Sequence, residues 1–115
     1  MADVRAQLSN LSVSAQKVRL VLDLVRGKDA NDALETLRFV PSLASVPVLK
    51  LLKSAVANAE ENLGISRDDL FISTIYANEA PTRKWRRFGA RGRFKPVLRR
   101  SSHVTIVLSE REATK

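Results

Sequence analysis

The stretch from Arg83 to Arg100 reads RKWRRFGARGRFKPVLRR, and the positive charge of the chain is concentrated in it. It holds 9 of the 20 Lys and Arg residues and no acid, whereas the rest of the chain has 11 bases against 12 acids. The net charge of +8 therefore belongs to these 18 residues. Like charges at this density repel one another unless a polyanion neutralises them. Interleaved aromatic residues, which stack on unpaired bases, and glycines, which allow close backbone approach, favour RNA as that polyanion.

Both flanks of this basic stretch, called the arm from here on (residues 83–100), have the pattern of β-strands. Residues 70–77 are rich in β-branched and aromatic side chains, and residues 102–108 alternate in polarity. A run of charge is more often a solvated face or a disordered tail, but flanking strands favour a long hairpin over about residues 80–101. If extended, the segment from Ala80 to Gly89 would reach about 30 Å. We therefore expect the hairpin to protrude.

The remainder of the chain predicts one strand and three helices. Residues 4–8 alternate as a half-buried strand. A first helix is expected over residues 15–26, capped by Ser12 or Ser14 and ended by Gly27. A second spans residues 32–40 before a proline. A third has Ser45 as its N-cap, or starts at residue 42 with a kink, and has Gly64 as its C-cap residue. The apolar stripes expected to face the core comprise Val18, Val21, Leu22, Val25, Ala33, Leu34, Leu37, Val48, Leu52, Ala55, Val56, Ala59 and Leu63.

These elements predict an α+β fold in a single domain over residues 1–115. The expected architecture is a small three-stranded antiparallel sheet packed on three helices, with a long protruding basic β-hairpin. The chain has no cysteine, which excludes disulfides and cysteine metal sites. No signal peptide or membrane span is apparent, so a soluble intracellular protein without membrane partners is expected.

The sequence offers little support for an enzyme. The only histidine, His103, has two neighbouring serines but no third group to orient it, which favours a structural or RNA-contacting role. Residues 60–61 and 68–69 are acidic pairs typical of helix ends and turns, and residues 89–92 lack the spacing of a nucleotide-binding loop. We therefore predict no catalytic residues, no metal, no cofactor and no small-molecule substrate.

Three separated stretches, Ser14–Arg19, Ser54–Glu60 and Arg99–Thr105, resemble signatures of a ribosomal protein family, that of the twenty-second protein of the bacterial-type large subunit. The resemblance runs from about Ala6 to Glu110. It implies a cytoplasmic, ribosome-bound globule near the mouth of the polypeptide exit tunnel, with the hairpin lining the tunnel wall. It also implies early assembly on large-subunit ribosomal RNA, with neighbouring large-subunit proteins and the nascent polypeptide as further partners. The alternative is a free-standing RNA chaperone or regulatory RNA-binding protein.

The candidate RNA contacts combine the arm with matching positions of the body. Lone bases near a helix start, such as Lys17 and Arg19, are more often solvated. The family resemblance, not the sequence pattern, is what favours these two residues as RNA contacts. Trp85 is expected to pack across the hairpin, whereas the two phenylalanines flank the tip and are expected to touch the partner. The full set is Lys17, Arg19, Arg83, Lys84, Arg86, Arg87, Phe88, Arg91, Gly92, Arg93, Phe94, Lys95, Arg99, Arg100 and His103, with a tip at Gly89, Ala90, Arg91 and Gly92.

Overall fold

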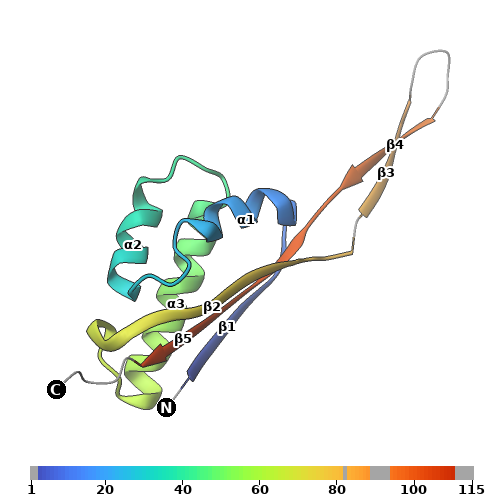
Figure 1. The fold of residues 1–115 in the computed structure, drawn as a ribbon. Coiled ribbons are helices and arrows are strands. Elements are labelled where there is room, and N and C mark those ends of the chain that lie inside the picture. Colours follow the sequence, from blue (N-terminus) through green and yellow to red (C-terminus); the bar gives the residue numbers. More distant parts are fainter. Residues whose placement is uncertain (1–2, 82, 89–93, 111–115) are drawn as a thin grey trace.

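The computed structural model describes residues 3–81, 83–88 and 94–110, and for the strands of the arm only the backbone is described. Helices cover one face of a three-stranded sheet, and a separate two-stranded ribbon leaves one end of it (Figure 1). The elements follow the order β1 (Asp3–Leu11), α1 (Ala15–Asp23), α2 (Ala30–Phe39), α3 (Ser45–Leu63), a 3-10 turn η1 (Arg67–Asp69), β2 (Leu70–Glu79), β3 (Arg83–Phe88), β4 (Phe94–Arg99) and β5 (Ser102–Glu110). The predicted α+β class is confirmed.

Gly64 ends helix α3, whereas Gly27 ends the turn that follows α1. Gly27 and Gly64 adopt left-handed backbone, with φ of +79° and +66°, a conformation that side-chain-bearing residues rarely adopt. Helix α3 begins at Ser45, and its N-cap is Ala44 instead of the predicted Ser45. Pro47 lies in its first turn, where a missing N–H removes no helical hydrogen bond. Helix α1 was predicted through residue 26 but ends at residue 23. Its last turn tightens, because the amides of residues 24 and 25 bond carbonyls three positions back.

The core lies between the helices and the central strand. Strand β5 pairs antiparallel with both β1 and β2, so it has no free edge. Its residues Val104, Ile106 and Leu108 are fully buried, and their two-residue spacing puts them on the face that the helices cover. The predicted stripes of α1 and α2 are buried or half-buried against this face, and most of that of α3 is. Leu63 was wrongly predicted to face inward: it is 48% exposed in the last turn of α3.

Strand β2 is an edge strand, and the chain covers its outer edge locally. The Ile72 amide donates to the Lys28 carbonyl at 2.9 Å, and Asp29 forms an isolated bridge with Phe71. The connection between α1 and α2 therefore satisfies backbone groups that an edge strand leaves open to other chains. None of the helices in the described part of the chain is long and apolar enough to cross a membrane.

The arm extends the molecule well beyond its body. Strands β3 and β4 form their own antiparallel ribbon and point away from the three-stranded sheet (Figure 1). The molecule measures 72 × 25 × 18 Å, and its radius of gyration is 17.5 Å. A compact chain of this length would have a radius of gyration of about 13 Å. The excess comes from the protruding hairpin, as the sequence predicted.

Candidate nucleic-acid interface

The register of the arm places bases opposite bases. Arg83 pairs with Arg99, and Arg87 pairs with Lys95, at opposite ends of the β3–β4 ribbon. Like charges at directly opposed positions destabilise a two-stranded ribbon, and such a ribbon is marginal on its own. A polyanion along the arm would relieve this repulsion. The predicted tip, residues 89–92, and the predicted contact Arg93 lie outside the described residues.

The same register sets the positions of the three aromatic residues. Trp85 lies opposite Val97, which gives an apolar cross-strand pair at the position where packing was predicted. Phe88 and Phe94 lie opposite each other in the last pair before the tip. Contact of the two phenylalanine side chains with the partner stays a prediction, because the side chains of the arm strands lie outside the described part of the structure.

Two predicted bases, Lys17 and Arg100, line one cavity at the root of the hairpin. This root cavity has a volume of about 640 Å³ and is lined by Ser12, Val13, Ser14, Ala15, Gln16, Lys17, Ser42, Leu43, Ala44, Glu79, Ala80, Arg100 and Ser101. Both bases are exposed. Helix α1 starts at the same end of the sheet from which the arm departs (Figure 1). Two of the three stretches that carry the family resemblance thus meet at this cavity, which sequence analysis did not foresee.

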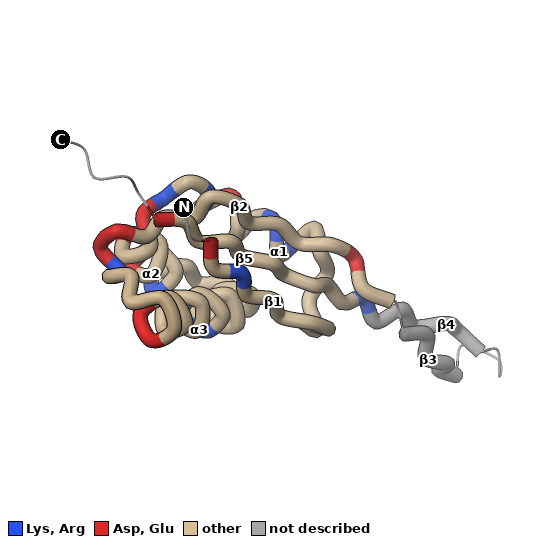
Figure 2. Tube along the Cα trace, turned by 90° about the horizontal axis from the view of Figure 1, so that it is seen from below, with Lys and Arg blue, Asp and Glu red and all other residues tan. Residues whose placement is uncertain are grey.

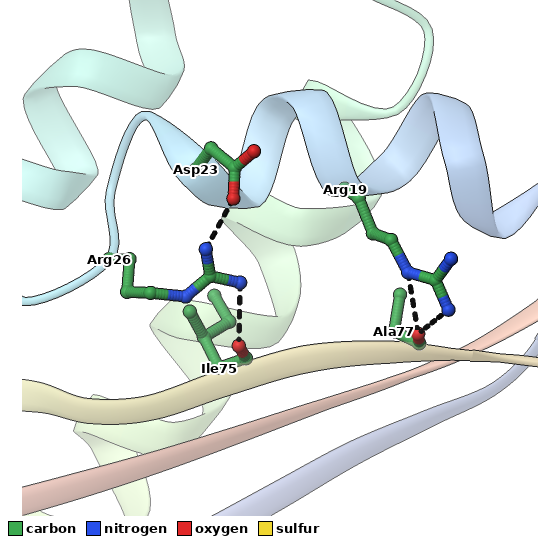
Figure 3. A network of polar contacts seen from close by, with 5 residues as sticks. All are labelled: Arg19, Asp23, Arg26, Ile75 and Ala77. Carbon is green, nitrogen blue, oxygen red and sulfur yellow. Dashed lines mark hydrogen bonds and ion pairs between the residues drawn. The ribbon is translucent and has the colours of Figure 1, made fainter.

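Arg19, a further predicted RNA contact, is engaged within the fold. Its Nε and Nη2 groups donate to the Ala77 carbonyl at 3.2 and 2.9 Å. In the turn that follows α1, Arg26 donates from Nη2 to the Ile75 carbonyl at 3.1 Å and from Nη1 to the Asp23 carboxylate (Figure 3). The two carbonyls are two residues apart on the outer edge of β2. These arginines therefore attach the helix to the edge strand and satisfy its backbone acceptors.

His103 also has a partner within the fold. The backbone amide of Asn10 donates to its Nδ1 at 3.0 Å. Asn10 has a φ of +56° and lies where the β1–β5 register shifts between Leu8 and Leu11. The imidazole thus satisfies an amide that the bulge withdraws from the ladder. This favours the structural role among those predicted for His103, and its Nε2 remains the nitrogen that could reach RNA.

Charge is distributed unevenly along the long axis. Acidic residues gather toward the end of the body remote from the hairpin, around the end of α3 and the start of β2 (Figure 2). Glu60 and Glu61 lie there in α3, and Asp68 and Asp69 lie in η1. Among the described residues, no three His, Cys, Asp or Glu side chains gather as a metal site would require. The body therefore presents an acidic end opposite a basic arm.

A nearly neutral α+β body with a basic two-stranded arm is the architecture of a small structural protein of a ribonucleoprotein particle. Comparison with known proteins identifies the family. The chain belongs to the family described as ribosomal protein L22p/L17e, whose model matches residues 6–109. It is accordingly a structural constituent of the large ribosomal subunit in the cytoplasm, not an enzyme, and this membership implies ribosomal RNA and ribosomal proteins as partners.

Individual relatives match over nearly the whole chain. The large ribosomal subunit protein uL22 of Clostridium kluyveri is 49% identical over 110 residues, which cover 96% of this chain and 99% of that protein. The uL22 protein of Pediococcus pentosaceus is 45% identical over 112 residues, covering 97% and 95%. That of Latilactobacillus sakei is 45% identical over 108 residues, covering 94% and 92%. The predicted family is confirmed.

Proposed function

We propose that the chain binds large-subunit ribosomal RNA with its arm, supports an early stage of subunit assembly and lines the polypeptide exit tunnel with the hairpin. The observation that carries this proposal is the coincidence of charge and shape. The segment that holds the whole net charge is the same segment that extends from the body as a ribbon. A charged surface that merely kept the protein soluble would not need to protrude.

The ribbon suits insertion between RNA helices. Its two strands lie about 5 Å apart, so the arm is much thinner than the body. Bases occupy both alternating sets of positions along β3, for example Arg86 and Arg87. Each face of the ribbon can therefore meet phosphates of a different RNA segment. Segments that are distant in the RNA sequence would be held together by one arm, which is how the chain would act during assembly.

The charge distribution would orient the molecule during this insertion. RNA attracts the arm and repels the acidic end of the body, so the arm enters first and the body stays outside. A hairpin inserted through the RNA in this way would reach the wall of the exit tunnel. There its tip, residues 89–92, would adjoin the nascent polypeptide.

Salt dependence of RNA binding tests the role of the arm. If about six phosphates are neutralised, the slope of log affinity against log salt should be about −4 to −5, which is a loss of about 500-fold between roughly 50 and 200 mM salt. Replacing Arg83, Lys84 and Arg87 together by Ala should reduce the slope by about 2 to 3. The matched control replaces Arg38, Lys50 and Lys53, which are exposed on α2 and α3. Equal slopes for the two triple variants would refute the arm as the main electrostatic contact.

Position in the ribosome needs separate measurements. A photoreactive residue at Arg91 should crosslink to stalled nascent chains, whereas one at Lys53 should not. Co-sedimentation should show the protein in early precursor particles and in mature large subunits alike. A free-standing chaperone would instead leave as the particles mature. Absence of any crosslink from the tip would contradict the tunnel placement while leaving RNA binding intact.

A further inference from the structure

We propose that the root cavity holds one nucleotide of ribosomal RNA that is turned out of its helix. This inference rests on the proposed function, because it names what one part of the RNA does at the base of the arm. The cavity brings together four segments of chain: the β1–α1 connection with the first turn of α1, the α2–α3 connection, the end of β2 and the β4–β5 connection. Its volume of about 640 Å³ lies within the roughly 300 to 1,000 Å³ typical of ligand pockets.

The charged groups of the cavity match a nucleotide better than a bare anion. Lys17 and Arg100 supply the cations for a phosphate, and Glu79 is the one acid among the lining residues. A carboxylate would repel an isolated phosphate ion. It would accept a hydrogen bond from a ribose 2′-hydroxyl or an exocyclic amino group. Two cations and one acceptor therefore suit a ligand with a phosphate at one end and hydrogen-bond donors at the other.

The uncharged groups of the cavity complete this match. Ser14 occupies the N-cap position of α1, but its side chain makes no capping hydrogen bond, so its hydroxyl can serve a ligand. Leu43 is 90% exposed and lies in the cavity wall together with the half-buried Val13. An exposed leucine alone needs no explanation. In the wall of a cavity lined by cations, it offers the apolar surface against which a base can lie.

RNA is favoured over a protein neighbour as the occupant for two reasons. The cavity lies where the arm begins, because Ala80 and Arg100 line it at the two ends of the arm, so RNA that follows the arm also reaches the cavity. Sequence-specific RNA recognition commonly uses unstacked nucleotides splayed out of loops and bulges. The protein would thus read one extruded nucleotide at the root of an arm that otherwise recognises phosphates.

The test combines a filled cavity with a removed cation, and the probe is a full-length large-subunit rRNA transcript. Ser12→Trp fills the cavity without a change of charge, and its control, Ser54→Trp, adds the same side chain on the exposed face of α3. Lys17→Gln removes a cavity cation, and its control, Lys50→Gln, removes an exposed one from α3. Circular dichroism melting verifies that each variant folds.

We expect Ser12→Trp to lower RNA affinity about tenfold with little change in salt slope. Lys17→Gln should reduce the slope by about 1, and both controls should bind as wild type. In ribose-reactivity footprints, Ser12→Trp should lose protection at one or two unpaired nucleotides and keep the protection given by the arm. If Ser12→Trp binds like Ser54→Trp, or if protection is lost only in paired RNA, the inference is wrong. If it keeps RNA affinity but fails to join large subunits, a protein neighbour occupies the cavity.

These results separate the inference from the proposed function. Normal cavity variants together with a weakened arm variant would refute the nucleotide site alone. Unchanged binding by the arm variant would refute the proposed function, whatever the cavity variants do.

Discussion

Replacing Arg19 by Met tests whether this arginine serves the fold before it serves RNA. Met keeps the length and helix propensity of the side chain but removes both hydrogen bonds to the Ala77 carbonyl, at 3.2 and 2.9 Å. Hydrogen bonds to charged groups contribute about 1.5 to 3 kcal/mol. Here the bonds are only partly buried, and water can reach the freed carbonyl at the sheet edge. We therefore expect a loss of about 1 kcal/mol in unfolding free energy.

Thermal and urea unfolding followed by far-ultraviolet circular dichroism measure this loss. A decrease of about 1 kcal/mol should lower Tm by roughly 4 to 6 °C for a domain of this size. The matched control is Lys17→Met in the same helix, with the same change of charge. Lys17 has no hydrogen bond or ion pair among the described residues, so its variant should differ from wild type by less than about 0.5 kcal/mol. Identical Tm values for the two variants would refute the idea that Arg19 holds α1 to β2.

Two further variants distinguish the structural role of Arg19 from a role in RNA binding. Arg19→Lys retains the positive charge but not the planar fork, so it should lose stability while keeping most of the RNA salt slope. A double variant at Arg19 and Arg26 should lose less unfolding free energy than the sum of the two single losses. Both side chains bond the same edge of β2 and hold α1 and the turn after it in place. Strict additivity would show that the two contacts act independently.

Three further substitutions test the fold by urea unfolding. His103→Leu removes the acceptor of the Asn10 amide and should cost about 1 kcal/mol, whereas no loss would show that water replaces the imidazole. Gly64→Ala places a β-carbon at a φ of +66° and should lower the unfolding free energy by about 1 to 2 kcal/mol. Gly64→Asn should lower it less, because Asn tolerates left-handed backbone better. Equal losses for the two variants would contradict a conformational cause. Leu52→Ala empties a fully buried position and should cost about 2 to 5 kcal/mol, whereas Leu20→Ala, at a side chain that is 68% exposed, should cost under about 0.5.

Much of the fold was predictable because its signals are local. Gly64 marks the end of α3 through backbone preference alone, and a spacing of three and four residues identifies the buried face of α1. The early end of α1 and the exposure of Leu63 were not predictable in this way. Both depend on how the last turn of a helix meets the rest of the molecule. The concentration of positive charge that defines the arm can be counted directly from the sequence.

The site was predictable in part, because its contacts join distant positions. Arg19 bonds a carbonyl 58 residues away, and a helical pattern shows only that its side chain lies off the buried stripe. His103 accepts a hydrogen bond from the amide of residue 10. A bulge leaves this amide without a partner in the sheet, and no short sequence motif predicts that. The root cavity unites four segments that are distant in the sequence, and no local pattern indicates that they lie together.

The body and the arm use their cations differently, and this difference suggests the path of the RNA. Arg19, Arg26 and Arg67 donate to partners in the body, so RNA would have to compete for their hydrogen bonds. Lys17 and Arg100 lie instead at the root cavity, next to the arm. A polyanion gains most from cations without internal partners, because no hydrogen bond is lost on binding. The RNA should therefore follow the arm to its root and end there, and charge removal should weaken binding less with increasing distance from the arm.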